Sequence, residues 1–205
     1  MQLIGRLRML MSGRWYQLIG KLYLRGCGVT VGASPTLHGL PIVARTSSSS
    51  IVVGDGVVLC SNSRFTALGV NHPVILRTLR PGSAIRIGNN CGLSGTVICA
   101  AQRVEIGNNA LIGANVTIAD TDFHPLDPEG RRFSNDQSKI ACAPVRLEDN
   151  VFVGAGSTIL KGVTIGENSV IGAGSVVTKS IPPNVVAAGN PCRPIKSLAV
   201  LEMLA

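Results

Sequence analysis

Branched aliphatic residues recur at every sixth position between residues 145 and 182. Small or polar residues follow most of them, and the column reads Leu147, Val153, Ile159, Ile165, Ile171 and Val177. A period of six fits neither a helix of 3.6 residues per turn nor the simple alternation of a half-buried strand. It is typical of a solenoid in which short strands meet at corners and each strand sends one side chain inward. Three such strands would close a triangular coil of about 18 residues, and successive coils would stack as paired strands.

The same period is present earlier in the chain, with interruptions. The inward columns predicted there are Ile87, Leu93 and Cys99, followed by Ile106, Ile112 and Ile118. The next repeat begins only at Leu147, so residues 120–144, which are polar and marked by prolines, are expected to form a projecting loop. A long loop on a regular scaffold is the usual place for chemistry. At the repeat corners, Gly166 is expected to adopt turn conformations, and Asn168 is expected to adopt left-handed torsions.

The two ends of the chain depart from the repeat, which divides it into residues 1–25, a β-helix over 26–182 and a C-terminal cap and tail over 183–205. Residues 1–25 have leucines spaced for one helical face, with arginines and lysines between them. This pattern predicts an amphipathic basic helix, which would pack on the end of the solenoid or on a neighbouring subunit, or dock on an anionic inner membrane. Arg6 and Arg8 interrupt the apolar run, which argues against a signal peptide or a membrane span.

Charge and cysteine content narrow the function classes. The net charge is +8, but the cations are dispersed and few aromatic residues lie between them, which disfavours nucleic-acid binding and favours anionic small molecules or a membrane surface. The six cysteines show no close pairing, and most sit in or beside strand positions, where a thiol acts as a small apolar filler. Together these features indicate a cytoplasmic protein, or one peripheral on the inner membrane.

Three features together resemble one known family. They are the hexapeptide coils, the loop sequence Asp-Thr-Asp-Phe-His-Pro at residues 120–125, and the ending Ile-Pro-Pro-Asn-Val-Val-Ala-Ala-Gly-Asn-Pro-Cys-Arg at residues 181–193. They are similar to the left-handed β-helix acyltransferases, in particular galactoside and maltose acetyltransferases and sugar O-acetyltransferases of polysaccharide biosynthesis. The resemblance covers about residues 85–196. It implies an all-β fold, a left-handed parallel β-helix with a protruding loop, an N-terminal helix and a short C-terminal cap.

The resemblance also implies a reaction and a catalytic base. In that family a histidine before proline in the protruding loop is the general base, and His124 matches it. An imidazole that titrates near neutral pH can take the proton from a sugar hydroxyl as that hydroxyl attacks a thioester. The expected reaction is therefore acetyl transfer from acetyl-CoA to a hydroxyl of a sugar or glycan precursor. No metal is expected.

The resemblance places acetyl-CoA in the groove between neighbouring subunits of a homotrimer. The matching cofactor positions are Phe152, Ala155, Ala173, Thr178, Lys179, Arg193 and Lys196. Lysine and arginine suit the phosphates of the cofactor. For Ala155 and Ala173 an alternative interpretation competes closely, because corners of the solenoid also require small residues.

The acceptor is less determined than the donor. Ser94 stands where galactoside-type enzymes use an asparagine to hold the sugar, and a hydroxyl has a shorter reach and different donors. Asp120 and Asp122 are candidates for binding acceptor hydroxyls or for orienting His124. The alternatives with the same fold are an N-acyltransferase of an amino sugar or nucleotide sugar, and a serine acetyltransferase. Other classes are a zinc lyase, which would need three histidine ligands, and a non-catalytic polysaccharide-binding scaffold.

Overall fold

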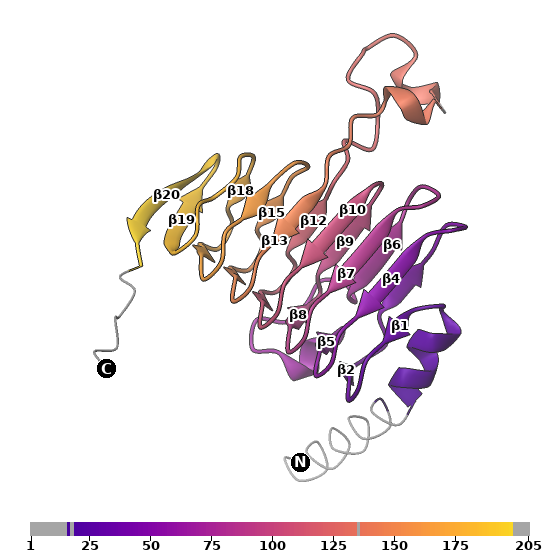
Figure 1. Ribbon diagram of the computed structural model, residues 1–205, viewed down its shortest axis with the longest axis vertical. Helices are drawn as coiled ribbons and strands as arrows, with labels where there is room; N and C mark the ends of the chain where they lie inside the picture. The colour runs from indigo at the N-terminus through magenta and orange to yellow at the C-terminus, as the bar shows by residue number, and fades with distance from the viewer. Residues whose placement is uncertain (1–15, 17–18, 135, 199–205) are drawn as a thin grey trace.

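In a computed structural model, which describes residues 16, 19–134 and 136–198, the backbone winds through three parallel sheets (Figure 1). Along the coils, successive strands pass from one sheet to the next in rotation, so each sheet takes every third strand as far as β18. This is the architecture that a six-residue period predicts, because each short strand supplies one rung of a three-sided prism. The fold is a left-handed parallel β-helix.

The sheets are called A, B and C below. Sheet A contains β1 (Thr30–Val31), β4 (Ser50–Val53), β7 (Ala84–Ile87), β10 (Arg103–Ile106), β13 (Val145–Leu147) and β16 (Thr164–Ile165). Sheet B contains β2 (Thr36–His38), β5 (Val58–Cys60), β8 (Gly92–Ser94), β11 (Leu111–Ile112), β14 (Phe152–Val153), β17 (Val170–Ile171), β19 (Val185–Gly189) and β20 (Cys192–Ser197). Sheet C contains β3 (Ile42–Ala44), β6 (Ile75–Thr78), β9 (Val97–Ala100), β12 (Thr117–Ala119), β15 (Thr158–Ile159) and β18 (Val176–Val177).

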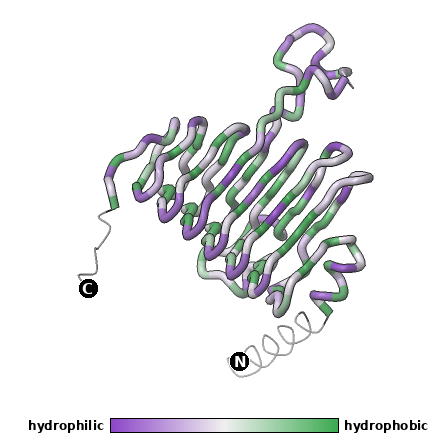
Figure 2. Tube along the Cα trace, in the orientation of Figure 1, coloured by the Kyte–Doolittle hydropathy of each residue, from purple (hydrophilic) through white to green (hydrophobic). Residues whose placement is uncertain are grey.

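The predicted column of branched aliphatics forms the core. All six residues from Leu147 to Val177 are buried, and they stack on the corresponding residues of neighbouring coils, as Ile112 does on Val153. Figure 2 shows hydrophobic and polar residues alternating along the stacked coils. The prediction for Cys99 is wrong by one residue, because Ile98 is the residue that pairs with Ile118, while Cys99 pairs with Ala119. The step from Leu93 to Ile98 is therefore one residue shorter than six, and the step from Ile98 to Ile106, around the corner that leads to β10, is two residues longer.

One corner of the prism is built by a ladder of asparagines. Asn90, Asn109, Asn150, Asn168 and Asn184 all have φ between 56° and 60°, and each side chain but the last donates to the next at 2.9–3.3 Å. The left-handed torsion predicted for Asn168 is confirmed. Gly166 is needed for a different reason from the one predicted, since its φ is not positive. A Cβ there would lie 2.4 Å from the backbone nitrogen of Pro183, so glycine is required by the close approach of two coils.

The ends of the solenoid are covered differently. Residues 19–26 are helical and cover the first coil, with Leu24 fully buried and Gly20 packed against Leu37. Apart from Tyr16, which is also helical, the rest of the predicted N-terminal helix lies outside the described residues. At the other end, β19 continues sheet B in parallel with β17 beyond Pro182 and Pro183, and β20 returns antiparallel to it. Most of the apolar tail over 198–205 also lies outside the described residues.

Two excursions leave the coils. Residues 61–73 form a short loop that contains the 3-10 turn η1 (Ser63–Phe65). Residues 120–144 leave sheet C after β12 and return to sheet A at β13, and they project well beyond the coils (Figure 1). This second loop contains η2 (Arg131–Phe133) and η3 (Gln137–Lys139).

Candidate active site

His124 is presented by a tight turn at the start of the projecting loop. Its backbone N–H donates to the carbonyl oxygen of Asp122 at 2.8 Å, across Phe123, whose φ is 63°. A hydrogen bond between residues two apart, around a residue with positive φ, is the signature of a γ-turn, and a non-glycine residue in that region is strained. The turn leaves the side chain of His124 exposed to solvent, where a base can reach a substrate.

Contacts from two other coils hold the base of the loop. Arg80 donates to the carbonyl of Ile140 at 3.1 Å and to Sγ of Cys142 at 3.3 Å, which fixes the returning strand. Nζ of Lys161 lies 2.6 Å from Oδ1 of Asp122, on the outgoing strand. The residues of the loop base are therefore fixed on both sides, although the tip projects. The sequence analysis did not identify Arg80 or Lys161 as site residues. The one available signal was that Lys161 lies one coil before Lys179, at the same corner.

Asp120 occupies a structural position at the root of the loop. Its carboxylate is fully buried and accepts the backbone N–H groups of Ala101, Gln102 and Arg103 at 2.6–2.7 Å. These groups belong to the lengthened corner between β9 and β10. A carboxylate with no exposed surface and three donors cannot also contact an acceptor, so we do not include Asp120 in the proposed acceptor site.

Asp122 differs from Asp120, because it lies nearer the surface. One carboxylate oxygen pairs with Lys161, while Oδ2 is buried and has no hydrogen-bond partner. Its backbone carbonyl closes the turn that carries His124. Asp122 is thus placed to affect the orientation of His124, and its contact with an acceptor stays a prediction.

The corner between sheets B and C carries three of the other predicted residues. Ser94 ends β8, and the carbonyls of Ala114 and Ala155 accept N–H groups from the following coils, so that Ala155 and Ala173 stack in one column. A Cβ on Gly154 would lie 2.4 Å from the nitrogen of Ala173, so the backbones are in contact at this corner. Phe152 points outward from sheet B just before the same corner and is 43% exposed. Close backbone packing by itself favours small residues here.

The predicted cationic positions lie toward the C-terminal end. Thr178 and Lys179 follow β18 and are exposed at the corner between sheets C and A, the corner from which the His124 loop also leaves. Arg193 and Lys196 are exposed on β20, where they pair with Ala188 and Val186. The column of small residues at the corner between B and C runs toward these last two cations.

A single chain does not bring all of these residues together. His124 and Lys179 stand at the corner between sheets C and A, whereas Ser94, Ala155 and Ala173 stand at the corner between B and C. The strands of sheet C separate the two groups. The fold therefore places the predicted base and the predicted thioester site on different edges of the same prism.

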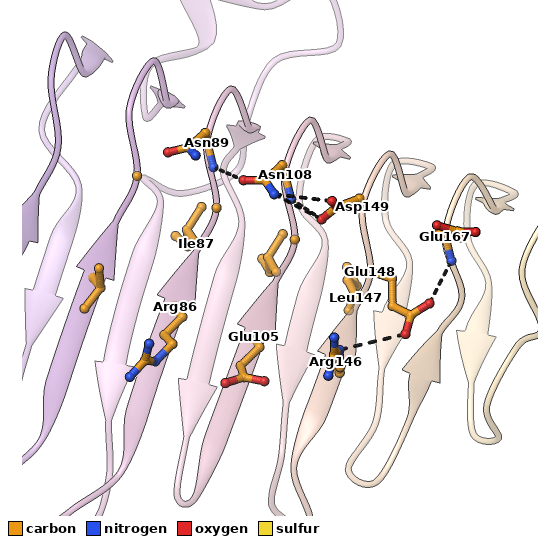
Figure 3. A pocket seen from close by; sticks show the side chains of 15 residues that line it. Arg86, Ile87, Asn89, Glu105, Asn108, Arg146, Leu147, Glu148, Asp149 and Glu167 are labelled. Carbon is orange, nitrogen blue, oxygen red and sulfur yellow. Dashed lines mark hydrogen bonds and ion pairs between the residues drawn. The ribbon is translucent and has the colours of Figure 1, made fainter.

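A hollow on sheet A lies away from all the predicted site residues. It has a volume of about 630 Å³, and Figure 3 shows Arg86, Glu105 and Arg146 along its strands. Its corner carries a second polar row, in which the backbone N–H of Asn108 donates to Asp149 at 2.7 Å. The polar side chains at this corner are already hydrogen-bonded to the backbone of neighbouring coils. We therefore interpret the hollow as a polar, solvated face and not as a binding site.

Among residues 16, 19–134 and 136–198, no three histidine, cysteine, aspartate or glutamate side chains gather at a spacing suited to a metal ion. No helix in the described part of the chain is both long and apolar enough to cross a membrane.

Comparison with known proteins defines the class to which this fold and site belong. The family model described as hexapeptide repeat of succinyl-transferase matches residues 144–179. Galactoside O-acetyltransferase of Escherichia coli is 47% identical over 118 residues, which are 57% of this chain and 56% of that protein. The chain spans about half the length of the first curated relatives that it matches, and 69% of Protein CapG of Staphylococcus aureus, at 37% identity.

Solved structures agree with the sequence relatives. A galactoside acetyltransferase in complex with coenzyme A shares 28% identity and a TM-score of 0.55 over 94% of this chain and 80% of that one. AntD of Bacillus cereus, an N-acyltransferase, has a TM-score of 0.67 at 20% identity, over 86% of this chain and 88% of that one, which shows a common fold. The class is that of hexapeptide-repeat β-helices. Within it, the chain belongs to the hexapeptide-repeat acyltransferase family.

Proposed function

We propose that the protein transfers acetyl from acetyl-CoA to a hydroxyl of a sugar or glycan precursor, of the kind used in surface polysaccharides, with His124 as general base. The observation that carries the proposal is the exposed His124 on a strained turn whose flanking residues are anchored to two coils. The names of the galactoside acetyltransferase relatives supply the substrate class. Imidazole removes the hydroxyl proton during attack on the thioester carbonyl, so no covalent enzyme intermediate is needed.

The donor is proposed to lie along the corner between sheets B and C. Ala155 and Ala173 present only methyl groups there, which leaves room for an extended pantetheine arm. Arg193 and Lys196 at the end of this path offer exposed partners for phosphates. Thr178 and Lys179 stand at the other edge of sheet C, so they would join this path only from a neighbouring subunit. The exposed ring of Phe152 would pack against the thiol end, beside Ser94 for the acceptor.

The faces of the prism support assembly as a homotrimer. The outward row of sheet A carries Arg86, Glu105 and Arg146, whereas the outward row of sheet B carries Leu111, Phe152, Val170 and Val186. Leu111 is 57% exposed in the single chain. An apolar row over four adjacent strands, from β11 to β19, favours burial against another surface. A neighbouring copy that covers sheet B would bring its His124 to the thioester site, which one chain cannot complete alone.

The first experiment measures thioester loss from acetyl-CoA with a panel of sugars and lipid-linked glycans, for the wild type and His124→Ala, with CoA binding measured in parallel. Binding to both proteins and turnover only by the wild type would support the proposal. Lys139→Met, an exposed change in the same loop, is the matched control and should keep its activity. If the wild type and His124→Ala both bind CoA and turn over at the same rate, His124 has no part in the mechanism.

Two further measurements address the remaining parts of the proposal. A product whose new acyl bond is cleaved by mild base is an ester, whereas a base-stable bond would indicate N-acylation. Sedimentation of Leu111→Glu, beside Arg86→Glu on the charged sheet A, tests the assembly. We expect only the sheet B variant to dissociate the trimer, because it buries a charge in an apolar contact. Two monomeric variants, or two trimeric ones, would contradict the assignment of the interface to sheet B.

A further inference from the structure

Lys161 makes the shortest ion pair among the described residues. Its Nζ lies 2.6 Å from Oδ1 of Asp122, and the two side chains are only 32% and 21% exposed. The other two pairs, Arg103–Glu105 and Arg146–Glu148, have separations of 3.9 Å, and their arginine side chains are 60% and 62% exposed. Partial burial and short distance strengthen a charge-assisted hydrogen bond relative to a surface pair.

This ion pair connects two different coils. Lys161 follows β15 in the coil after the loop, at the corner between sheets C and A, while Asp122 lies just inside the loop. The neighbouring Gly162 donates its N–H to the carbonyl of Ala143, where the loop returns. Residues 161 and 162 therefore contact both the outgoing and the returning strand of the loop base. Lys161 makes its contact through a charged side chain, and Gly162 through its backbone.

The ion pair between Lys161 and Asp122 lies next to the turn that carries His124, the base of the proposed mechanism. The carbonyl of Asp122 accepts the N–H of His124, and Phe123 between them has a φ of 63°. A non-glycine residue in this conformation is strained and persists only where its surroundings impose it. Fixing the carboxylate of Asp122 from outside the loop restrains the residue that starts the turn.

We propose that Lys161 is a positioning residue, which holds Asp122 through its carboxylate and so maintains the turn that aims the imidazole of His124. This inference rests on the proposed function for its catalytic consequence. Its structural part does not, because the turn and the ion pair exist whatever the reaction. Asp122 acts here through its backbone carbonyl on His124 and through its side chain on Lys161.

The kinetic test compares Lys161→Met and Lys161→Arg with the wild type, using acetyl-CoA and an accepted sugar. A misdirected base should lower kcat by about 10- to 100-fold in Lys161→Met and leave the KM for acetyl-CoA unchanged. Lys161→Arg keeps a cation and should recover part of the loss. Asp122→Asn should reproduce the defect, and adding Lys161→Met to it should cost little more, because both changes break one contact. An unchanged kcat with a raised acceptor KM would overturn the proposal in favour of direct substrate contact.

The second test does not depend on activity. Hydrogen–deuterium exchange is measured by mass spectrometry on peptides that contain residues 121–125 and residues 111–118, in the wild type, Lys161→Met and Lys139→Met. We expect about tenfold faster exchange over 121–125 in Lys161→Met only, with the coil peptide unchanged. Equal exchange of that peptide in all three proteins would overturn the proposal even if the enzyme is active. Faster exchange in a protein without acetyltransferase activity would keep the structural role of Lys161 and reject the proposed function instead.

Discussion

The carboxylate of Asp120 accepts the backbone N–H of Arg103 at 2.6 Å, across the corner between β9 and β10. The same carboxylate accepts the N–H groups of Ala101 and Gln102. The chain advances eight positions from Ile98 to Ile106 at this corner, rather than the regular six, so these groups do not continue the regular ladder between coils. Asp120, at the root of the loop, supplies the acceptors that the lengthened corner needs, and the loop and the corner are thereby coupled.

Replacing Asp120 by asparagine should destabilise the protein. The amide keeps one acceptor but turns an NH2 group toward buried N–H donors, so we expect the free energy of unfolding to fall by roughly 3 kcal/mol. Urea unfolding at a fixed protein concentration measures the change. Asp127→Asn, on the exposed part of the loop, is the matched control and should stay within about 0.5 kcal/mol of the wild type. Equal stabilities for the two variants would show that the corner does not depend on the carboxylate.

A second prediction concerns the close approach of two coils at Gly166. Alanine there would put Cβ 2.4 Å from the nitrogen and 2.7 Å from Cα of Pro183, both backbone atoms that cannot move aside as a side chain would. Gly166→Ala should lower the free energy of unfolding by about 2 kcal/mol or more. Gly26→Ala provides the contrast, because nothing lies within 4 Å and the residue is helical, so alanine should be neutral or slightly stabilising. A stable Gly166→Ala protein would mean that the corner can widen.

The fold was predictable from the sequence because one short-range rule generates it. The period that aligns Leu147 with Val153 and Ile159 is local, and it sets strand length, corner position and inward direction together. The inward position predicted at Cys99 is wrong because the coil has one residue fewer than usual before Ile98 and two more after it. The total length of a coil does not show how its residues are divided between the corners.

The candidate site was less predictable, because its contacts join residues far apart in the chain. Asp120 and Asp122 look equivalent in the motif, yet one is buried under three backbone donors and the other pairs with Lys161. No periodicity could assign the two roles. The separation of His124 from Ser94 by sheet C likewise depends on the sheet to which each preceding strand belongs. That assignment requires every strand before it to be placed correctly.

The cysteines offer a third prediction. Burial raises the pKa of the Cys91, Cys99 and Cys192 thiols, and all three are almost inaccessible. Because the thiolate is the reactive form, these residues should be alkylated slowly in the folded protein. The partly exposed Cys27 and Cys142 should be labelled first, as mass spectrometry of iodoacetamide-treated protein would show. Early labelling of Cys91 or Cys99 would indicate that the coils open locally.

The last prediction follows from His38, which ends β2 and stacks against Phe65 with ring centroids 4.5 Å apart. Its Nδ1 is buried without a hydrogen-bond partner, and desolvation lowers the pKa of the ring below its ordinary value of 6.5. The unfolded chain therefore takes up a proton at a higher pH than the folded protein does. Stability from this group is present above about pH 6.5 and is lost as the pH falls through the lower folded pKa.

Substitution should remove this part of the acid sensitivity. The free energy of unfolding, measured from pH 7.5 down to pH 5, should fall less steeply in His38→Gln than in the wild type, whatever the offset between them at pH 7.5. Phe65→Leu keeps the histidine but uncovers its ring, so its pH dependence should also become shallower, because the desolvation that lowers the pKa is relieved. Parallel curves for the wild type and His38→Gln would show that acid unfolding is set by other groups.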